Sequence, residues 1–349
     1  MKMLHIASFS GQSGISKYAN NFFDLILKPR GYEKLDSKLC NSTAIKGIKL
    51  DYAVHVEIGV NETAAIRTLY QLIDGGHRNV SVTLHDPPFI SWPYYQFRSQ
   101  RLNEFSKFIH LYLRNFKIGD GYFKSINKIF VLTHAGVRKT ESRYRLTNVF
   151  YLPHLIIPGA PNLSMLPTPP NLIFFGYIAK NKRLDYALKL HERLLDFVPQ
   201  CKFFVVGSEV DNVSSKYLRE LKSRYKSNVE YLGFVEDVRL QEIFSLASIA
   251  VMPFEPYKSI IPASGSVLSA MAAGKIVCAT PVNAIPEFIL DGKTGVLLRG
   301  DLAVDTERIR TLLTSHGGVN KISRNAVEFL RLGHGVIPVG CAFDNPNRS

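Results

Sequence analysis

The stretch NLIFFGYIAKNKRLDYALKLHERLLDFVPQCKFFVVG, residues 171–207, contains two apolar runs that each end in glycine. Between them, a pattern from Leu184 to Phe197 places apolar residues on one face of a helix. This order predicts strand, turn, helix and strand, the repeating unit of a parallel sheet. Glycine at the strand ends, Gly176 and Gly207, suits close backbone approach by a ligand at the carboxyl edge of a doubly wound sheet.

The same alternation continues on both sides of this stretch. Apolar runs separated by helical patterns recur at residues 52–58, 80–88, 128–134, 149–154, 229–235, 248–254 and 275–281. Strands that alternate with helices belong to parallel sheets, because the crossover between parallel strands is usually a helix. We therefore predict an α/β protein built from doubly wound sheets.

A proline-rich stretch divides the chain. Residues 156–171 carry five prolines, which is typical of a linker between domains. A chain of 349 residues also exceeds what one hydrophobic core usually organises. We expect four segments, namely a first Rossmann-like domain at 1–158, a linker at 159–170, a second Rossmann-like domain at 171–318 and a C-terminal helix and tail at 319–349.

The composition is that of an ordinary folded protein, with 46% hydrophobic and 21% charged residues. No run reaches the roughly 18 uninterrupted apolar residues of a membrane-spanning helix. The N-terminus lacks the basic and apolar regions of a secretory signal, so we expect a cytoplasmic location. Four widely spaced cysteines have no metal-ligand spacing and are interpreted as reduced thiols: Cys40, Cys201, Cys278 and Cys341.

The net charge of +14 is concentrated in one segment. Residues 91–145 hold eleven Lys and Arg against three acids, interleaved with aromatic residues. Such a segment suits an anionic membrane surface, an anionic acceptor or nucleic acid. The alternative is a solvated basic helix whose aromatic side chains face the core.

The opening loop, SFSGQSGISKYANN at residues 8–21, lies between an apolar run and a helical pattern. Strand, glycine loop and helix is an arrangement that binds phosphate, and Gly14 is the candidate residue. The loop matches neither GxGxxG nor GxxxxGK[ST]. It can also be a tight turn in which Ser13 or Ser16 caps the helix.

In combination, four stretches of the second half resemble the donor-binding domain of glycosyltransferase family four: NLIFFGYIAKNKRLDYAL, FFVVG, VEYLGFVEDVRLQEIFSLASIAVMPF and SGSVLSAMAAGKIVCATPVNAIPEFILDGKTGVLL. The first half resembles the family's acceptor domain through its glycine loop and the stretches TLHDPP, FVLTHAG and YLPH. The resemblance implies the GT-B fold, in which two Rossmann-like domains face a central cleft. It also implies a nucleotide-sugar donor, transfer with retention of configuration, and no metal.

The resemblance places a diphosphate-binding lysine at Lys182, six residues after Gly176. Where the family has an arginine directly after that glycine, this chain has Tyr177. Lys180 and Arg183 are close enough in sequence to replace the missing cation, or they face solvent. Without a metal, such cations must neutralise the charge that grows on the leaving diphosphate.

A second candidate for diphosphate binding is the start of a predicted helix at Ser264, Gly265 and Ser266. Free backbone amides there would face an anion, reinforced by the helix dipole. The alternative is a plain helix cap made by Ser264.

The family's two glutamates align with Ile261 and Ser269, so Ser269 is left as the candidate for ribose binding. Base contacts are expected near Phe234 and Val235. Neither aligned position carries a charge, which puts donor preference and activity in question.

In the first half, His85 follows an apolar run and precedes two prolines. The resemblance places a histidine there against the donor sugar, so His85 and Lys182 are the candidate catalytic residues. His134 and His154 end later runs in the same way and are weaker candidates.

These observations favour a glycosyltransferase that adds a sugar to a cell-surface polysaccharide or a lipid-linked glycan precursor at the cytoplasmic face of a membrane. The expected partners are a nucleotide-sugar donor, a glycan or lipid-linked acceptor and an anionic membrane surface, with no nucleic acid. No metal or cofactor is expected, because the chain lacks the Asp-x-Asp triplet of metal-dependent transferases. The alternative is a catalytically silent GT-B subunit that supports an active partner.

Overall fold

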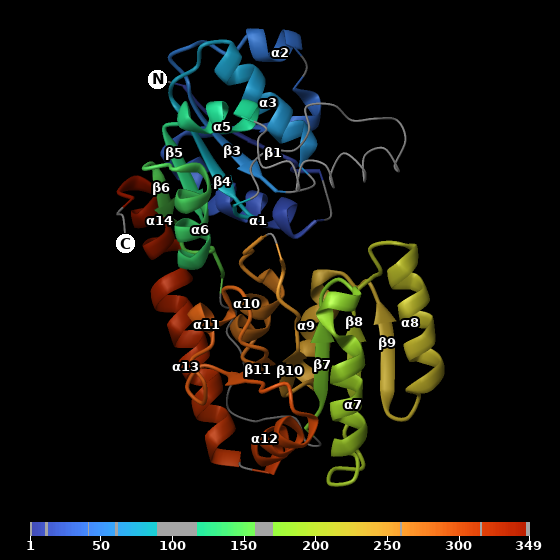
Figure 1. The fold of residues 1–349 in the computed structure, drawn as a ribbon. Coiled ribbons are helices and arrows are strands. Elements are labelled where there is room, and N and C mark those ends of the chain that lie inside the picture. The colour runs from blue at the N-terminus through green and yellow to red at the C-terminus, as the bar shows by residue number, and fades with distance from the viewer. Residues whose placement is uncertain are drawn as a thin grey trace. The chain divides into compact units, whose positions relative to one another are not determined.

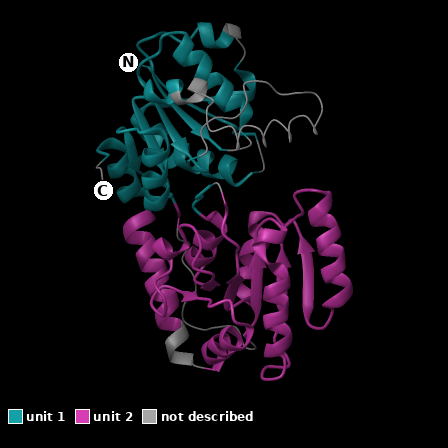
Figure 2. Cartoon of the chain, in the orientation of Figure 1, with its two compact units in different colours: residues 1–155, 259–263, 336–349 teal, residues 156–258, 264–335 magenta. Residues whose placement is uncertain are grey.

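The apolar runs predicted from the sequence form the strands of two parallel sheets, one in each of two compact units (Figures 1 and 2). The computed structural model describes residues 2–10, 13–40, 42–59, 62–88, 117–157, 170–258, 260–314 and 316–346. Unit 1 comprises residues 1–155, 259–263 and 336–349, and unit 2 comprises residues 156–258 and 264–335. The predicted alternation of strands and helices is therefore confirmed in both halves.

The division between the units differs from the expected segments at the C-terminus. The chain returns to unit 1 at Val336, so the last helix packs in the first domain and forms no separate tail. The proline-rich linker lies almost entirely outside the described residues. Because this return joins residues that are far apart in sequence, no local pattern could predict it.

The sheet of unit 1 has the strand order β2-β1-β3-β4-β5-β6, and all its pairs are parallel. Its strands are β1 (Met3–Ala7), β2 (Tyr32–Asp36), β3 (Ala53–Ile58), β4 (Val80–Leu84), β5 (Lys128–Val131) and β6 (Val149–Tyr151). Its helices are α1 (Gly14–Phe22), η1 (Phe23–Leu27), η2 (Lys28–Arg30), η3 (Ser37–Leu39), α2 (Ser42–Lys46), α3 (Thr63–Asp74), α5 (Lys117–Lys124), α6 (His134–Tyr144) and α14 (Val336–Asp344).

Two apolar cores cover the two faces of this sheet. One core joins the even-numbered residues of β1, β3 and β4 to α3 and α5. The other is rich in aromatic residues and contains side chains of α1, η1 and α14, including Phe22, Phe23 and Phe343. Since successive strand residues point to opposite faces, the odd-numbered residues of β1, β3 and β4 face this aromatic core.

The sheet of unit 2 has the order β12-β11-β10-β7-β8-β9, again with parallel pairs. Its strands are β7 (Leu172–Phe175), β8 (Phe203–Val206), β9 (Val229–Gly233), β10 (Ile249–Met252), β11 (Ile276–Ala279) and β12 (Val296–Leu297). Its helices are η4 (Lys180–Lys182), α7 (Leu184–Leu194), α8 (Asn212–Arg224), α9 (Asp237–Leu246), α10 (Gly265–Ala272), α11 (Ile285–Phe288), α12 (Leu302–Thr314) and α13 (His316–His334).

This strand order reverses direction between β7 and β10. It corresponds to the 3-2-1-4-5-6 order of doubly wound dinucleotide-binding sheets, in which ligands bind beyond the carboxyl ends of the strands at the point of reversal. The segments after β7 and β10 are therefore the first place to look for a binding site in unit 2.

By length and composition, one stretch of the described chain, Asn320–Asp344, is apolar enough to cross a membrane, with a mean hydropathy of 1.2. Buried helices of water-soluble proteins meet the same criterion. Here the stretch consists of α13 and α14, which are separated at Gly335 and belong to different units. The hydroxyl of Ser323 in α13 donates a hydrogen bond of 2.6 Å to the carbonyl of Gly274, so the first of these helices is packed on unit 2.

Candidate functional site

Two glycines shape the carboxyl edge of the unit 2 sheet. Gly176, directly after β7, has a φ of +125°, and an added Cβ would lie 3.4 Å from the Cβ of Ser266. Gly207, directly after β8, has a φ of +144°, and its added Cβ would lie 1.8 Å from the carbonyl oxygen of Gly176. At Gly207 the neighbouring loop makes a close backbone approach, while Gly176 lies against the start of α10.

Lys182 lies at the end of η4, on the segment that follows β7. Its ammonium nitrogen is 3.8 Å from the centroid of the Phe254 ring and 5.5 Å from that of Tyr257. Burial lowers the pKa of Lys182 to about 8. Among the described residues, no carboxylate forms an ion pair with this ammonium group, so its charge is available to an anionic ligand.

The two aromatic residues come from the segment after β10, on the other side of the strand reversal. The hydroxyl of Thr280 donates a hydrogen bond to the carbonyl of Phe254. The backbone N–H of Tyr257 donates to Oδ1 of Asn283 at 2.9 Å. The segments after β10 and β11 thus hold both rings, and with them the lysine, in place.

The two cationic residues next to Lys182, Lys180 and Arg183, have different surroundings from Lys182. The guanidinium of Arg183 lies 3.3 Å from a carboxylate oxygen of Glu255 and 3.5 Å from one of Asp185. Lys180 and Tyr177 are exposed at the same edge. Because Arg183 already has carboxylate partners, Lys182 is the cation of this segment that is better suited to a diphosphate.

The start of α10 presents backbone amides next to Gly176. Ser264 occupies the N-cap position, but its hydroxyl makes no capping hydrogen bond and lies 3.2 Å from the hydroxyl of Ser266. Ser264 is thus the N-cap residue, as predicted, but its side chain does not make the capping bond that the alternative requires. Because that hydroxyl leaves the first-turn amides of Gly265 and Ser266 uncapped, they can bind an anion, and the helix dipole favours one.

The remaining donor-side candidates are more widely spread. Ser269 lies one turn into α10 and is half-buried. Phe234, which is 60% exposed, and Val235 follow β9. Since β8 separates β9 from β7, these residues lie roughly 10 Å, or two strand spacings, from the strand that leads to Lys182. Within the described part of unit 2, the rings near the Lys182 ammonium group are those of Phe254 and Tyr257, and Phe234 is not among them.

In unit 1, the strand order reverses between β1 and β3, and the opening loop follows β1. Gly14 is the first residue of α1, and an added Cβ there would meet no atom within 4 Å. The hydroxyl of Ser13 accepts a hydrogen bond of 3.1 Å from the backbone N–H of Ser16, so Ser13 is the N-cap. The predicted cap by Ser13 is confirmed, and the described residues leave open space at Gly14.

His85 lies directly after β4, as the sequence predicts, but its ring is 7% exposed and bonded within the unit. Its Nε2 lies 2.7 Å from Oε2 of Glu57, and its ring packs edge-on against Tyr18 with centroids 4.9 Å apart. His154 is buried against the same tyrosine, whereas His134 stacks on Tyr151 at 3.8 Å. The structure therefore brings His85 and His154 to one tyrosine and leaves His134 apart.

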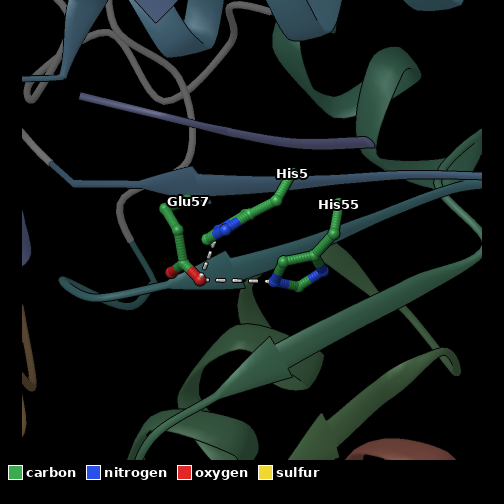
Figure 3. A group of neighbouring side chains, drawn as sticks. All are labelled: His5, His55 and Glu57. Carbon is green, nitrogen blue, oxygen red and sulfur yellow. Dashed lines mark hydrogen bonds and ion pairs between the residues drawn. The ribbon is translucent and has the colours of Figure 1, made fainter. Parts of the chain in front are cut away.

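Glu57 is the centre of a buried cluster that sequence reasoning missed (Figure 3). Its Oε1 lies 3.3 Å from Nε2 of His5 and 3.4 Å from Nε2 of His55. Burial opposes ionisation of Glu57, but hydrogen bonds from His5, His55 and His85 outweigh it and hold its pKa well below the usual range. Burial also lowers the pKa of His5 to about 4.

The ligand-type atoms of His5, His55 and Glu57 lie within 4.8 Å of one another, which is close enough for one metal ion. These atoms already have partners, however. Nε2 of His55 lies 2.9 Å from the hydroxyl of Thr83, and its Nδ1 lies 2.8 Å from the hydroxyl of Ser81. The three ligand-type atoms are therefore engaged in a hydrogen-bond network, although Nδ1 of His5 is buried without a hydrogen-bond partner in the described structure.

A sequence signal for this network existed in the strand alternation. The odd-numbered residues of three strands are polar where an apolar side chain would be normal for a buried sheet: His5, His55, Glu57, Ser81 and Thr83. Pairing of β1 with β3 sets His5 opposite His55, and pairing of β3 with β4 sets Glu57 opposite Thr83. Polar residues in a repeated alternation can be noticed in the sequence, but only the register shows that they meet.

Much of the basic segment lies outside the described residues, which exclude 89–116. In the described remainder, Phe123 and Tyr144 are part of the apolar core. The exposed cations of this remainder are Lys124, Arg138, Lys139, Arg143 and Arg145. In this part of the segment, Phe123 and Tyr144 therefore pack in the core while these five cations face solvent.

Comparison with known proteins agrees with this geometry. Residues 169–315 match the family model described as glycosyl transferases group 1. A relative from Klebsiella pneumoniae, an uncharacterized 41.2 kDa protein in the cps region, is 28% identical over 148 residues. That match spans 42% of this chain and 36% of the relative.

Several solved structures are similar to most of this chain. Sucrose-phosphate synthase from Thermosynechococcus elongatus is similar with a TM-score of 0.71 and 14% identity, over 99% of this chain and 98% of that one. Anabaena HepE in complex with UDP-glucose has a TM-score of 0.69 and 13% identity over the same shares. TarM of S. aureus, in a complex containing UDP, has a TM-score of 0.62 and 16% identity, over 88% of this chain and 56% of that one.

Two Rossmann-like units with parallel sheets, similar to these enzymes, define the GT-B class of fold. The match to the family model of group 1 glycosyl transferases covers residues 169–315, which lie in unit 2. The predicted GT-B fold is confirmed, and the resemblance predicted for the second half agrees with the group 1 match.

Proposed function

We propose that this protein is a glycosyltransferase that uses a nucleotide-sugar donor, with the donor diphosphate bound by unit 2. The observation that carries the proposal is the Lys182 ammonium group, held on two aromatic rings at the strand reversal without a carboxylate partner in the described residues. Cleavage of a glycosyl phosphate bond leaves a highly charged diphosphate, and a preorganised cation stabilises that charge as it develops. The amides of Gly265 and Ser266 add to it.

Uridine is the base we propose. HepE has been solved with UDP and with UDP-glucose, and TarM with UDP, which supports the choice by similarity of fold. The base would bind near Phe234 and Val235, and a ribose hydroxyl would bond to the hydroxyl of Ser269. Gly14 of unit 1 would allow the backbone to approach the diphosphate or the reacting sugar.

The proposed reaction is transfer with retention and without a metal. The bond between the anomeric carbon and the diphosphate oxygen breaks, a bond to an acceptor hydroxyl oxygen forms, and the hydroxyl proton leaves with the diphosphate. His85 would bond a hydroxyl of the transferred sugar. The sequence supports the absence of a metal, because it lacks an Asp-x-Asp triplet.

The acceptor we propose is a cell-surface polysaccharide or its lipid-linked precursor, assembled at the cytoplasmic face of a membrane. Two observations support this acceptor: the cps-region relative and the exposed cations on and around α6. Anionic headgroups attract such cations by about 1 kcal/mol for each residue near the surface.

A catalytically silent subunit is the second candidate. The observation that favours it is the absence of a carboxylate at Ile261 and Ser269. Ile261 belongs to unit 1, where its backbone N–H donates a hydrogen bond of 2.6 Å to the carbonyl of Pro87. At Ile261 the structure therefore shows a backbone hydrogen bond within unit 1 and no acidic side chain.

The test is release of free nucleoside diphosphate from a panel of UDP- and GDP-sugars, with and without a chelator. We expect slow hydrolysis of one UDP-sugar, unaffected by the chelator, and an α-configured sugar as the first product of an α-linked donor. Lys182→Ala should lower turnover more than tenfold and leave the fold intact. A protein that neither binds nor hydrolyses any of these donors would be the silent subunit.

A further inference from the structure

The polar cluster of unit 1 forms a continuous chain of contacts that ends at His85. The hydroxyls of Ser81 and Thr83 hold the His55 ring, at 2.8 and 2.9 Å. His55 and His5 flank Oε1 of Glu57, and Oε2 of Glu57 lies 2.7 Å from Nε2 of His85. Ser81 is half-buried, and the other members are buried, with His85 the most exposed of them at 7%.

Aromatic rings fix this chain from one side of the sheet. The His5 ring stacks on Phe23 with centroids 6.0 Å apart, and the His55 ring meets Phe343 of α14 at 5.2 Å. Tyr18 packs edge-on against His85 at 4.9 Å. Because the rings are packed on several sides, the carboxylate of Glu57 has little freedom to turn away from His85.

The ionised state of Glu57 determines which nitrogen of His85 carries a proton. A carboxylate only accepts hydrogen bonds, so Nε2 of His85 must be the donor. At 2.7 Å and out of water, this bond to a charged group is of the strong kind. In a neutral His85 ring, Nδ1 is then the unprotonated nitrogen, and no hydrogen bond to Nδ1 is made by the described residues.

We propose that Glu57 is a positioning residue, which holds His85 in the Nε2–H tautomer with Nδ1 turned to accept a hydrogen bond from the donor sugar. This inference rests on the proposed function, because it needs a sugar in contact with His85. It adds a role for Glu57, which lies on β3, the strand next to the one that leads to His85, and which is not expected to touch the substrate. Removing the carboxylate should disturb the sugar step and leave nucleotide binding alone.

The electrostatics agree with a glycosyl transfer. The transition state carries positive charge on the sugar, and the negative charge of Glu57 behind the His85 ring favours that charge. Glu57→Gln keeps the size of the side chain but removes its charge, and its amide can either donate to or accept from the histidine. The tautomer of His85 is then no longer fixed.

The experiment combines ¹⁵N spectroscopy of the imidazole rings with donor kinetics, on the full chain. In the wild type, we expect His85 to be protonated at Nε2. In Glu57→Gln, we expect mixed tautomers, a fall in kcat of more than tenfold for hydrolysis of the UDP-sugar, and UDP affinity within twofold of wild type. The double variant Glu57→Gln/His85→Ala should be no slower than His85→Ala, since Glu57 acts through that ring.

His5→Gln is the matched control, because it removes another neighbour of Glu57 without touching His85. We expect its His85 tautomer to be unchanged and its kcat to stay within threefold of wild type. A loss equal to that of Glu57→Gln would mean that the whole cluster acts only through stability, and would overturn the proposal. Independent losses in the double variant would overturn it as well.

The spectroscopic arm separates this inference from the proposed function. A wild-type His85 ring protonated at Nδ1, or a tautomer that Glu57→Gln does not change, overturns the role of Glu57 even if the enzyme is active. A wild-type protein that binds no UDP and hydrolyses no donor overturns the proposed function and the sugar-facing role of His85 with it. If Glu57→Gln fails to fold, the wild-type tautomer still decides the assignment.

Discussion

The ammonium nitrogen of Lys182 lies 3.8 Å from the centre of the Phe254 ring. Lys182 follows β7 and Phe254 follows β10, the two neighbouring strands between which the strand order reverses. The aromatic face attracts the cation but cannot neutralise it. Burial accordingly lowers the pKa of Lys182 to about 8. A charge that is partly desolvated and not paired with a carboxylate among the described residues reduces stability in the free protein and is compensated when an anion binds.

Lys182→Met should therefore stabilise the protein while removing donor binding. Methionine fills a similar volume and packs well against aromatic rings. We expect the free energy of unfolding to rise by roughly 1 kcal/mol at pH 7, because a partly buried charge is removed. Thermal unfolding measures this change. Lys180→Met, at an exposed position nearby, should change stability by less than about 0.5 kcal/mol. A destabilised Lys182→Met protein would mean that the ammonium group has a structural partner.

The affinity for UDP should fall as the pH rises through about 8, the pKa of the Lys182 ammonium group in the folded protein. Above that pH the lysine is neutral and no longer attracts the diphosphate. Lys182→Arg should bind UDP with much less dependence on pH between 7 and 9, because a guanidinium stays charged. Calorimetric titrations across this range measure both proteins. Equal pH dependence in the two would assign it to another group.

The same group makes stability depend on pH with a definite sign. The pKa of Lys182 is lowered from 10.5 to about 8 on folding, so between these pH values the unfolded chain binds more protons. Stability from this group therefore increases as the pH rises from about 8 to 10.5. Denaturant unfolding of wild type and Lys182→Met should differ less at pH 10 than at pH 7. A difference that grows with pH would contradict the assignment.

Gly207→Ala should be far more damaging than Gly233→Ala. Both glycines have positive φ, but a Cβ at Gly207 would lie 1.8 Å from the carbonyl oxygen of Gly176, whereas one at Gly233 meets no atom within 4 Å. We expect Gly233→Ala to cost about 1 kcal/mol from backbone strain alone. Gly207→Ala should cost about 3 kcal/mol or more and weaken UDP binding, since the loop after β7 must move. Similar losses in both variants would show that the two loops are not tightly packed.

Features formed by neighbouring residues could be predicted from this sequence, whereas features formed by residues far apart in the sequence could not. The strands, their terminal glycines, and the positions of Lys182 and Ser266 could be located because each follows from a short run of residues. The contact of Lys182 with Phe254 could not, since it depends on β7 lying beside β10. Glu57 and its histidines were missed for the same reason, because they meet only through the register of three strands. The return of α14 to unit 1 has no local signature.

Charge reversal of Arg138, Lys139 and Arg143 should weaken association with anionic vesicles. These exposed cations lie on α6. We expect the wild type to sediment with anionic but not neutral vesicles, and to be released as salt shortens the Debye length from about 10 Å at 0.1 M to 3 Å at 1 M. Reversal of Lys216, Arg219 and Lys222, on α8 of unit 2, is the control with the same change of net charge. If both triple variants lose binding equally, the net charge and not the α6 surface drives association.

The cations at Arg98, Arg101, Lys107 and Arg114 lie outside the described residues, and Lys117 begins α5.

The central claim is that unit 2 binds a nucleoside diphosphate through Lys182, and calorimetric titration of the full chain with UDP tests it most directly. We expect UDP to bind the wild type at pH 7 and to bind Lys182→Met at least tenfold more weakly, a loss of about 1.4 kcal/mol or more. Lys180→Met should bind UDP like the wild type. Binding of UDP with equal affinity to the wild type and Lys182→Met, or no binding of UDP to a folded wild-type protein, would contradict the account.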